Sequence, residues 1–288
     1  MVFLLKLNIS TIMWLFRFSF CFQVAIIDAG STGTRLHIYT FDGDKVLKSE
    51  TFYNNGPIER NQHSEAEGII KDLLNRGQVT KLIPIAFYGT AGLRSYNKTA
   101  DLIKVIRNVL YLYNLIEIKV LKGFEEGLGL FEAFQYFLDS DQKYTLFDMG
   151  GKSTQVVQKN YNEVTISSVD TGIASKRQFY RPSIASKPDL IYLFSGFADV
   201  LTNIKYGKIS DIDRMKKKSC KMQKSYLCND LNFLMEFFDQ MRLKHDQQFK
   251  VIDEIKGFYI SWPLGKAIKI AKNIKNTKYL YNKKLFIR

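Results

Sequence analysis

The chain has 288 residues, of which 46% are hydrophobic and 24% charged, and its net charge is +14. This composition excludes a disordered, collagen-like or disulfide-dense chain, and the length allows one large domain or two modest ones with a real core. The excess of Lys is compatible with nucleic acid, an acidic membrane or a small polyanion as partner, and equally with an ordinary solvated surface. No nucleic-acid-binding motif accompanies the charge, so no nucleic-acid partner is predicted.

Residues 1–22 differ from the rest of the chain. Lys6 precedes the apolar stretch Leu7–Phe16, and Ser19–Cys21 offers a small-residue cleavage site. This pattern favours a secretory signal or a short uncleaved anchor over a hydrophobic N-terminal strand. Arg17 interrupts the stretch, which is too short to span a bilayer comfortably. We therefore expect a protein in the lumen of the secretory pathway (ER or Golgi) or secreted, without a stable membrane span unless this segment is retained.

The predicted elements alternate between strands and helices. In the first half, strands are expected at 24–28, 35–41, 45–52, 83–88 and 116–121, and helices at 64–75, 99–113 and 125–138, with Gly77 ending the first helix. Further strands are expected at 144–148, 154–158 and 164–168, and the remainder is interpreted as mostly helical, near 188–201, 230–241 and 262–271. This order predicts an α/β protein.

An internal repeat organises the chain. Val24–Arg35 aligns without gaps on Tyr144–Gln155. Each copy is an apolar strand, then Asp-x-Gly, then a turn of small residues with Thr, then a second β-rich run. Because a repeat constrains the architecture, the two copies predict two similar lobes that face each other across a cleft.

The repeated turn has the chemistry of a phosphate site. A Gly-rich turn leaves backbone N–H groups free to point at an anion, and Gly lets the backbone approach closely. Asp28 and Asp148, which end the two strands, would repel phosphate directly, so they are predicted to hold a hydrated Mg²⁺ or Ca²⁺. A single copy of the turn is weak evidence, since turn geometry alone also selects Gly and Asp. The aligned pair favours phosphate binding.

Two further motifs lie between the copies. Gly123–Gly127 opens a helix with Glu125 and Glu126, which either complement the helix dipole or supply a general base that activates water. Phe87–Arg94 is a strand that enters a tight turn. Arg94 in this turn pairs with a carboxylate or a phosphate, or braces the fold.

Together, these motifs resemble the conserved regions of the apyrase (nucleoside triphosphate diphosphohydrolase) family. Regions one to four correspond to residues 27–35, 89–94, 123–127 and 147–155, and Ser261–Gly265 resembles the fifth. The resemblance covers about residues 24–270. The form of the first motif resembles the soluble and Golgi diphosphatases more than the cell-surface triphosphatases.

The resemblance implies an actin/Hsp70-like (ribonuclease H-like) α/β fold of two lobes, with lobe I at 23–122 plus 262–288 and lobe II at 123–261. It implies that Glu126 activates a water for direct attack on the terminal phosphate of a nucleoside di- or triphosphate, and that Thr90, Ser153 and Gln155 orient this water. Asp28 and Asp148 would carry Mg²⁺ or Ca²⁺ through its water shell, and a monomer is expected. The implied phosphate-binding residues are Ser31, Thr32, Gly33, Thr34, Arg35, Gly150, Gly151, Ser153 and Thr154.

The chain departs from the family at several positions. Lys152 stands where relatives carry a small residue, and Phe131 stands where they often carry Trp. The segment between the fourth and fifth motifs, which usually builds the base-recognition pocket, is short. Phe258, Tyr259 and Trp262 either stack on a base or belong to the core.

Two kinds of alternative remain. The first is an exopolyphosphatase-like hydrolase or a sugar kinase on the same fold, against which the second and fifth motifs argue. The second is a non-catalytic nucleotide-binding or surface protein on an apyrase scaffold. The presence of every implied catalytic residue argues against it.

The three cysteines match no metal-binding pattern. Cys220 and Cys228 are close enough in sequence to close a small loop by a disulfide, which suits an oxidising compartment, or they are two free thiols. Cys21 belongs with the predicted signal. Asn97–Thr99 is an N-glycosylation sequon, usable only in the secretory lumen.

Overall fold

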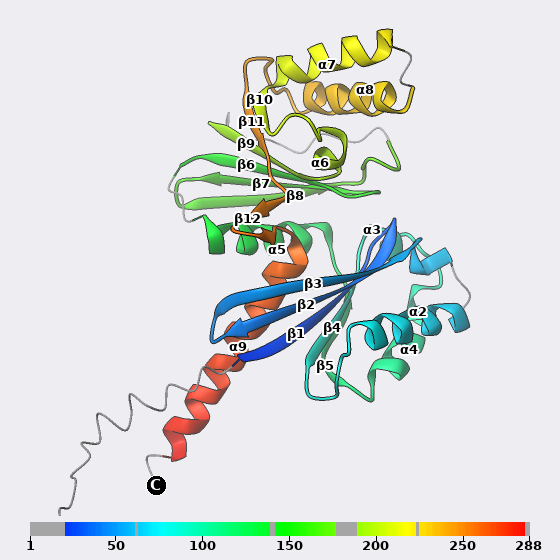
Figure 1. Cartoon of the computed structure of the whole chain (residues 1–288), viewed down its shortest axis with the longest axis vertical. Helices are drawn as coiled ribbons and strands as arrows, with labels where there is room; N and C mark the ends of the chain where they lie inside the picture. Colours follow the sequence, from blue (N-terminus) through cyan, green and yellow to red (C-terminus); the bar gives the residue numbers. More distant parts are fainter. Residues whose placement is uncertain (1–20, 61–62, 139–141, 177–188, 223–224, 286–288) are drawn as a thin grey trace, which may run out of the picture.

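A computed structural model describes residues 21–60, 63–138, 142–176, 189–222 and 225–285. The chain forms two β-sheets that lie one above the other, with helices on their outer faces and two helices between them (Figure 1). The two-lobed α/β architecture predicted from the repeat is confirmed. The leader predicted at 1–22 falls outside the described residues except for Cys21 and Phe22, which already belong to the first strand.

The first sheet contains β1 (Cys21–Ala29), β2 (Gly33–Asp42), β3 (Lys45–Asn55), β4 (Pro84–Gly89) and β5 (Asn114–Val120). Its helical elements are η1 (Ile58–Arg60), α2 (His63–Arg76), α3 (Ala91–Arg94) and α4 (Thr99–Leu110). The second sheet contains β6 (Tyr144–Met149), β7 (Thr154–Asn160), β8 (Glu163–Val169), β9 (Leu190–Ser195), β10 (Tyr206–Lys208) and β11 (Gln248–Val251). The remaining elements are α5 (Gly123–Phe137), α6 (Gly196–Val200), α7 (Ile209–Lys221), α8 (Ser225–Gln240), β12 (Glu254–Ile255), β13 (Phe258–Tyr259) and α9 (Trp262–Leu285).

The two sheets share one topology. The strand order is β3-β2-β1-β4-β5 in the first and β8-β7-β6-β9-β11-β10 in the second. In each, an antiparallel three-strand meander is followed by two strands that run parallel to its first strand, and the second sheet adds β10, antiparallel to β11, at its edge. The repeat seen in the sequence therefore extends from one turn to a whole lobe.

The central strand β1 is apolar without alternation because it is covered on both faces. Val24 and Ile26 pack toward the space between the lobes, and Ala25 and Ile27 pack toward α2 and α4. All four side chains are fully buried. β1 therefore holds Asp28, near its end, in a fixed place.

The helices α5 and α9 lie between the sheets, where α9 packs on β1 and β2 and α5 packs on β7 and β8. Their backbones touch at two glycines. A Cβ on Gly265 would lie 1.9 Å from the carbonyl oxygen of Gly129, and a Cβ on Gly129 would lie 2.7 Å from that of Trp262. Close helix contact of this kind needs the absence of a side chain, so these glycines fix how the lobes meet.

The largest error of the sequence analysis is in lobe II, where 188–201 was predicted as a helix. In the structure, β9 occupies Leu190–Ser195 and only the short α6 is helical. Ile191 and Leu193 face the core under α7 and α8, whereas Tyr192 and Phe194 face the inter-lobe core. A strand between β6 and β11 is buried on both faces, so its apolar run resembled a buried helix.

Smaller differences also have physical causes. The helix predicted to 113 ends at Leu110. The left-handed residue that ends α2 is Gln78, with φ 50°, and not Gly77. Gln78 N–H donates to Asn75 and Val79 N–H to Leu74, which is the Schellman pattern. Gly77 instead packs closely on β2, because a Cβ there would lie 2.6 Å from the end of the Leu36 side chain and would force it to move. The region interpreted as mostly helical also contains the strands β10 to β13.

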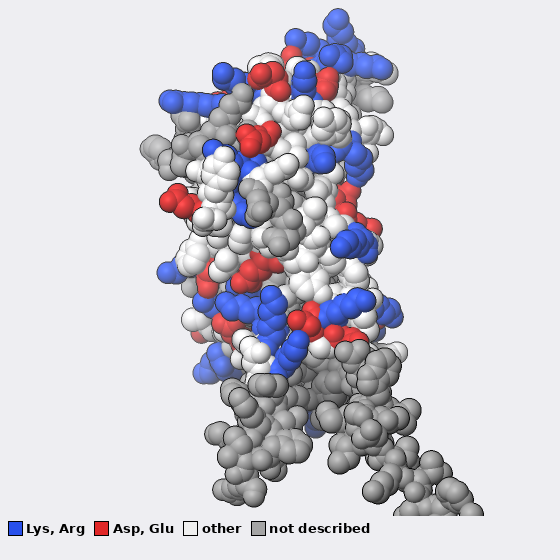
Figure 2. Space-filling model, turned by 90° about the vertical axis from the view of Figure 1, so that its left-hand side faces the viewer, with Lys and Arg blue, Asp and Glu red and all other residues white. Residues whose placement is uncertain are grey.

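The charge is spread over the surface. On the face shown in Figure 2, Lys and Arg are interspersed with Asp and Glu, with basic residues prominent at the upper end where α7 lies. Of the described helices, none combines the length and apolarity that crossing a bilayer requires.

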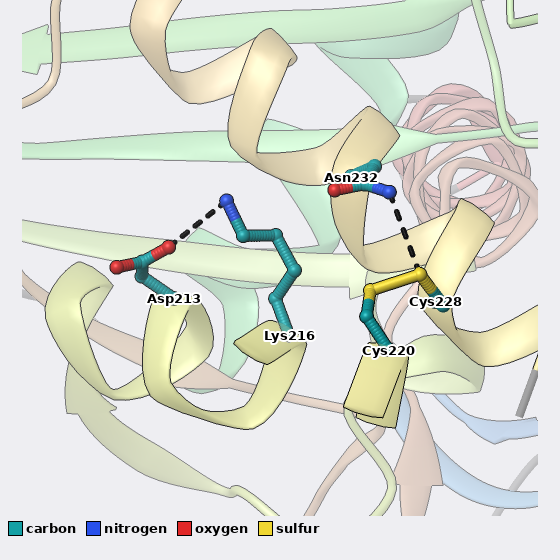
Figure 3. The surroundings of a disulfide bond; sticks show 5 residues. All are labelled: Asp213, Lys216, Cys220, Cys228 and Asn232. Carbon is teal, nitrogen blue, oxygen red and sulfur yellow. Dashed lines mark hydrogen bonds and ion pairs between the residues drawn. A yellow bond between two sulfur atoms is a disulfide. The ribbon is translucent and has the colours of Figure 1, made fainter. Parts of the chain in front are cut away.

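Cys220 and Cys228 form a disulfide that joins the end of α7 to the start of α8 (Figure 3). It closes a short loop, with a sequence separation of 8. We expect the double substitution Cys220→Ser/Cys228→Ser to lower the free energy of unfolding by ~2–3 kcal/mol, since the unfolded chain regains loop entropy. Urea unfolding measures this change. Cys21→Ser is the control, because Cys21 is exposed and unpaired. Equal stability of all three proteins would contradict the expectation.

Candidate active site

A cavity of about 640 Å³ lies between the two lobes. Eleven of the predicted site residues line it, and they come from both sheets, α5 and the turn after β4. These residues are Asp28, Ser31, Thr32, Arg35, Thr90, Glu126, Asp148, Gly150, Gly151, Ser153 and Gln155. The structure thus brings together motifs that are up to 127 positions apart (28 to 155) in sequence.

The two repeated turns face each other at this cavity. In each, the first Gly donates its N–H to the carbonyl of the residue three positions on: Gly30 to Gly33 and Gly150 to Ser153, both at 2.9 Å. The strand registers also match, with Asp28 opposite Arg35 and Asp148 opposite Gln155. A Cβ on Gly151 would lie 2.5 Å from the Thr32 side chain and 2.8 Å from Ser31 Oγ. The two turns therefore touch across the cleft, and both line the same cavity with equivalent backbone geometry.

Asp28 and Asp148 are buried carboxylates close enough to influence each other. Burial raises the pKa of Asp28 to about 6, Arg35 opposes this rise and Asp148 adds to it. Burial also raises the pKa of Asp148, whose Oδ1 accepts a 2.6 Å hydrogen bond from Ser195. Oδ1 of Asp28 is buried without a hydrogen-bond partner. Two neighbouring buried carboxylates with one positive partner, Arg35 at 3.6 Å from Asp28, fit a divalent cation held through water, because a cation would offset the remaining negative charge.

Within the described ranges, no cluster of three or more His, Cys, Asp or Glu side chains forms a direct metal site.

Glu126 lies in the first turn of α5, and its side chain is almost completely buried. Its Oε1 accepts a short hydrogen bond from Arg94, whose guanidinium also donates to the Leu121 carbonyl at 2.9 Å. Burial raises the pKa of Glu126 to about 8, although Arg94 opposes the rise. Arg94 does not line the cavity. Of the two roles predicted for Arg94, the structure thus shows the pairing with a carboxylate. Glu125 points to Lys119 instead, at 2.6 Å.

Three polar side chains surround the cavity near Glu126. Thr90 Oγ1 donates to the Ala29 carbonyl at 3.3 Å, which leaves its lone pairs free to accept. Gln155 Nε2 donates to Ser153 Oγ at 3.0 Å and approaches Ser168 Oγ at 3.5 Å. Hydroxyl and amide groups fixed in this way can orient a water molecule.

Three of the predicted phosphate-binding residues do not line the cavity. Thr34 and Thr154 are fully buried beneath the turns, and Thr154 Oγ1 donates to the Thr171 carbonyl at 2.8 Å. Gly33 lies against the Tyr53 ring, where a Cβ would come within 2.6 Å. Gly33, Thr34 and Thr154 therefore shape the turns. None of the three is placed to contact a ligand in the cavity through a side chain.

The cavity also includes residues that the sequence analysis did not select. Ser195 ends β9 with φ 56°, a left-handed conformation that is strained for a non-glycine residue, and it donates to Asp148. The other newly found polar and aromatic residues are His37, Thr51, Tyr53 and Asp199. Tyr259 and Trp262, which the sequence offered either for base stacking or for the core, also line the cavity. Ser195 was hidden because β9 had been predicted as a helix, while polar residues at the ends of parallel strands are expected at such sites.

Comparison with known proteins agrees with this geometry. The sequence profile of the GDA1/CD39 (nucleoside phosphatase) family matches residues 22–183. The chain belongs to this family. The match includes the first four motifs and therefore both repeated turns and Glu126.

Curated relatives within the family are distant. The chain is 29% identical over 161 residues to the guanosine-diphosphatase of Saccharomyces cerevisiae, covering 46% of this chain and 31% of that protein. It is 26% identical over 181 residues to the human nucleoside diphosphate phosphatase ENTPD5, covering 54% of this chain and 42% of that protein. The chain thus spans well under half the length of these relatives.

Solved structures support the fold alone. The Ppx/GppA enzyme of Aquifex aeolicus superposes with a TM-score of 0.62 at 15% identity, covering 86% of this chain and 99% of that one. An exopolyphosphatase-like protein superposes with a TM-score of 0.63 at 14% identity, covering 88% and 99%. Both confirm the two-lobed arrangement.

This member of the GDA1/CD39 family has an ion pair across its cleft. Lys152, in the second turn, reaches Glu59 of lobe I, with 3.4 Å between Nζ and Oε1. Glu59 is buried, and its Oε2 has no hydrogen-bond partner. Its carboxylate lies against Gly92, where a Cβ would come within 2.3 Å of Oε1. Lys152 does not line the cavity, and its ion pair ties the second turn to η1 of the other lobe, where Glu59 packs on Gly92.

We expect Lys152→Met to lower the free energy of unfolding by about 1–3 kcal/mol, because it leaves the Glu59 carboxylate buried and unpaired. Lys217→Met is a matched control, since Lys217 pairs with Asp213 on the exposed surface and such pairs contribute about 0–1 kcal/mol. Urea unfolding of both variants measures the difference. A loss no larger than that of the control would show that the inter-lobe pair is unimportant.

A pH dependence follows from the burial of Glu126. If Glu126 is the general base, as we propose below, it must be ionised, and because burial raises the pKa of its carboxyl to about 8, activity would be lost as the pH falls through that value. A bound divalent cation lowers the pKa and moves this limb toward lower pH. An unperturbed Glu has a pKa of ~4.3. We expect kcat/KM for phosphate release to rise with pH, with the midpoint of the rise well above that value. A midpoint near the value of an unperturbed Glu would contradict the expected burial effect.

Proposed function

We propose that this chain is a metal-dependent phosphohydrolase that releases the terminal phosphate of nucleoside di- or triphosphates. The observation that carries the proposal is the pair of equivalent Asp-Gly turns that touch across a cavity also lined by Glu126. Membership of a nucleoside phosphatase family and the activities for which the curated relatives are named support it.

The proposed reaction is a direct attack of water on the terminal phosphorus, which breaks its bond to the bridging oxygen and releases inorganic phosphate and a nucleotide that is one phosphate shorter. Glu126, when ionised, takes the proton from the water while Thr90, Ser153 and Gln155 hold it by hydrogen bonds. Ser31 and Thr32 from one turn, with backbone N–H groups of both turns, bind the terminal phosphate. Arg94 is a positioning residue, because it fixes the Glu126 carboxylate. Preorganised donors of this kind stabilise the charge that develops in the transition state.

Asp28 and Asp148 would hold Mg²⁺ or Ca²⁺ through water. The cation would supply charge neutralisation at the phosphate oxygens. The two buried carboxylates, one with an unpartnered oxygen, support this assignment.

The lining of the cavity favours a nucleotide over inorganic polyphosphate. Arg35 is the only Lys or Arg among the described residues that line it. A chain of phosphates would need several cations. Tyr53, Tyr259 and Trp262 also line the cavity, and such rings suit a planar base. Since the solved structures share only the fold, their exopolyphosphatase names do not transfer to this chain.

The test is phosphate release from GDP, UDP, ADP, ATP and inorganic tripolyphosphate, each with Mg²⁺ or Ca²⁺ and with EDTA. We expect turnover of at least one nucleotide that exceeds turnover of tripolyphosphate and stops with EDTA. Faster release from tripolyphosphate would favour the exopolyphosphatase alternative. No release by the folded, metal-loaded protein would leave a nucleotide-binding protein on this scaffold.

We further propose that the protein works in the secretory lumen or outside the cell. The Cys220–Cys228 disulfide supports an oxidising compartment, and Asn97 of the sequon is exposed at the surface. Sensitivity of the secreted or luminal protein to an N-glycosidase, lost in Asn97→Gln, tests this location. An unmodified, reduced protein in the cytosol would contradict it.

A further inference from the structure

Ser195 occupies a sharp bend between β9 and α6, in the wall of the cavity. Its backbone has φ 56° and ψ −119°, a combination that strains a residue with a Cβ. Ser195 pairs with Met149 in the parallel register of β6 and β9, and a Cβ on the next residue, Gly196, would lie 2.8 Å from the Met149 carbonyl oxygen. The backbone of the bend is therefore held closely against the end of β6, which maintains the strained conformation.

The bend brings the Ser195 hydroxyl to a carboxylate of the proposed cation site. Ser195 Oγ donates a 2.6 Å hydrogen bond to Asp148 Oδ1, and Asp148 is only 5% exposed. A serine hydroxyl has one proton, so the proton given to Asp148 is not available to a phosphate oxygen. Ser195 therefore acts on a ligand in the cavity through Asp148 and not as a donor to the phosphate.

The internal repeat shows why Asp148 depends on this hydroxyl. In lobe I, the residue opposite Asp28 is Arg35, and the two side chains pair at 3.6 Å. In lobe II, the residue opposite Asp148 is the uncharged Gln155, whose amide donates to a serine of the second turn instead. The cationic partner of the first carboxylate thus has no counterpart at the second. Among the residues that the structure describes, Ser195 is the side chain that donates to Asp148.

A third residue extends this hydrogen-bonded chain toward the open side of the cavity. Tyr259, in β13, lines the cavity, is 44% exposed and forms a side-chain hydrogen bond with Ser195. Because the Ser195 proton is given to Asp148, the Tyr259 hydroxyl is the donor to Ser195 Oγ. A hydroxyl that accepts one hydrogen bond and donates another has a fixed direction, and each bond strengthens the next.

We propose that Ser195 is a positioning residue of the cation site, which holds the Asp148 carboxylate in the orientation that receives a hydrated divalent cation. Carboxylates at metal sites are commonly oriented by a hydrogen bond from a neighbouring residue. The strained bend between β9 and α6 keeps the hydroxyl at the required place. This inference rests on the assignment of Asp28 and Asp148 to the cation in the proposed function.

The test measures cation binding separately from catalysis. Mn²⁺, which accepts the same oxygen ligands as Mg²⁺, is titrated into the full chain and followed by the electron paramagnetic resonance of the free ion. The titration is run with the α,β-methylene analogue of GDP, in which a CH₂ group replaces the oxygen of the bond to be broken. We expect Ser195→Ala to bind Mn²⁺ ~10–100-fold more weakly, the usual effect of losing such a partner. Ser210→Ala, in α7 and outside the cavity, is the control and should not change the affinity.

Ser195→Gly separates the hydroxyl from the strain. Glycine adopts a φ of 56° without a Cβ contact, so this variant should unfold at a higher urea concentration than Ser195→Ala. Both variants lack the hydroxyl, so both should lose the same factor in Mn²⁺ affinity. In phosphate release, both should need more Mg²⁺ for half-maximal rate and keep kcat at saturating Mg²⁺ within a few-fold. A Ser195→Gly variant that binds Mn²⁺ as tightly as the unsubstituted chain would overturn the proposal, because the bend would then act through stability alone.

The remaining outcomes distinguish this inference from the proposed function. If the unsubstituted chain binds Mn²⁺ and Ser195→Ala binds it equally well, the inference is overturned and the proposed function is unaffected. If the unsubstituted chain and Asp148→Asn bind Mn²⁺ equally, or neither binds it, the cation assignment itself is wrong and the inference fails with it. A larger loss in Tyr259→Phe than in Ser195→Ala would overturn the assignment to Ser195 in favour of Tyr259.

Discussion

Replacing Glu126 with Gln is expected to lower kcat for phosphate release by ~10²–10⁴-fold, the range that general bases contribute. The substitution removes the group that accepts the proton but keeps the size of the side chain. An amide oxygen can still accept the hydrogen bond that Arg94 donates to Oε1. We therefore expect the fold and the affinity for nucleotide to be retained. The measurement is steady-state phosphate release at saturating metal, with nucleotide affinity determined separately.

Glu125→Gln provides a control within the same helical turn. Glu125 caps α5 through the Lys122 N–H and pairs with the exposed Lys119, and it does not line the cavity. Its loss should lower stability slightly and leave kcat within a few-fold. If both variants lost activity equally, the loss would come from disturbance of the first turn of α5 and not from removal of a general base. If Glu126→Gln kept most of its activity, another group would have to accept the proton.

The cavity-lining residues that could be predicted are those whose positions depend only on neighbouring residues in the sequence. Asp28 and Asp148 each follow an apolar run and precede a Gly-rich turn, so strand, turn and exposed hydroxyl are all set by neighbours in sequence. The gap-free repeat also predicted that Asp28 and Asp148 occupy equivalent places in two lobes that face each other. The direction in which each side chain points along β2 and β7 decides which hydroxyl groups face the core instead of the cavity. Thr34 and Thr154 face the core, and a short sequence motif does not reveal this.

The parts that escaped prediction depend on contacts between distant segments. The apolar run that forms β9 has no alternation because both its faces are buried between β6 and β11, so periodicity did not identify it, although its length and its Ile, Tyr and Phe favour a strand. Its misassignment concealed Ser195. The pairing of Lys152 with Glu59 joins residues 93 positions apart, and the sequence showed only that Lys152 was unusual. Tyr53 enters the site because it lies opposite Arg35 in the sheet, a relation set by the register of β2 and β3.

Gly172 packs behind the Gly150–Gly151 turn, and nothing in the sequence marks its importance. It is buried, and the N–H groups that follow it hold this turn in place: Ile173 donates to the Gly150 carbonyl at 3.1 Å and Ala174 to that of Gly151 at 3.0 Å. A Cβ on Gly172 would lie 2.3 Å from the Gly150 oxygen and 2.7 Å from the Gly151 carbonyl carbon. Because these are backbone atoms, no side-chain rotation can relieve the contact.

Gly172→Ala is therefore expected to displace the Gly150–Gly151 turn and to lower kcat/KM by ~10²-fold, the scale of a 1 Å misplacement of groups that position a substrate. The free energy of unfolding should fall by only ~1–3 kcal/mol, typical of one overpacked methyl group. Gly68→Ala is the control, since Gly68 lies in α2 with no atom within 4 Å of a Cβ, and Ala is favoured there. Phosphate release and urea unfolding on both variants separate the two effects. Activity close to that of the control would mean that the turn tolerates the shift, and that phosphate binding does not require the close match between the two turns.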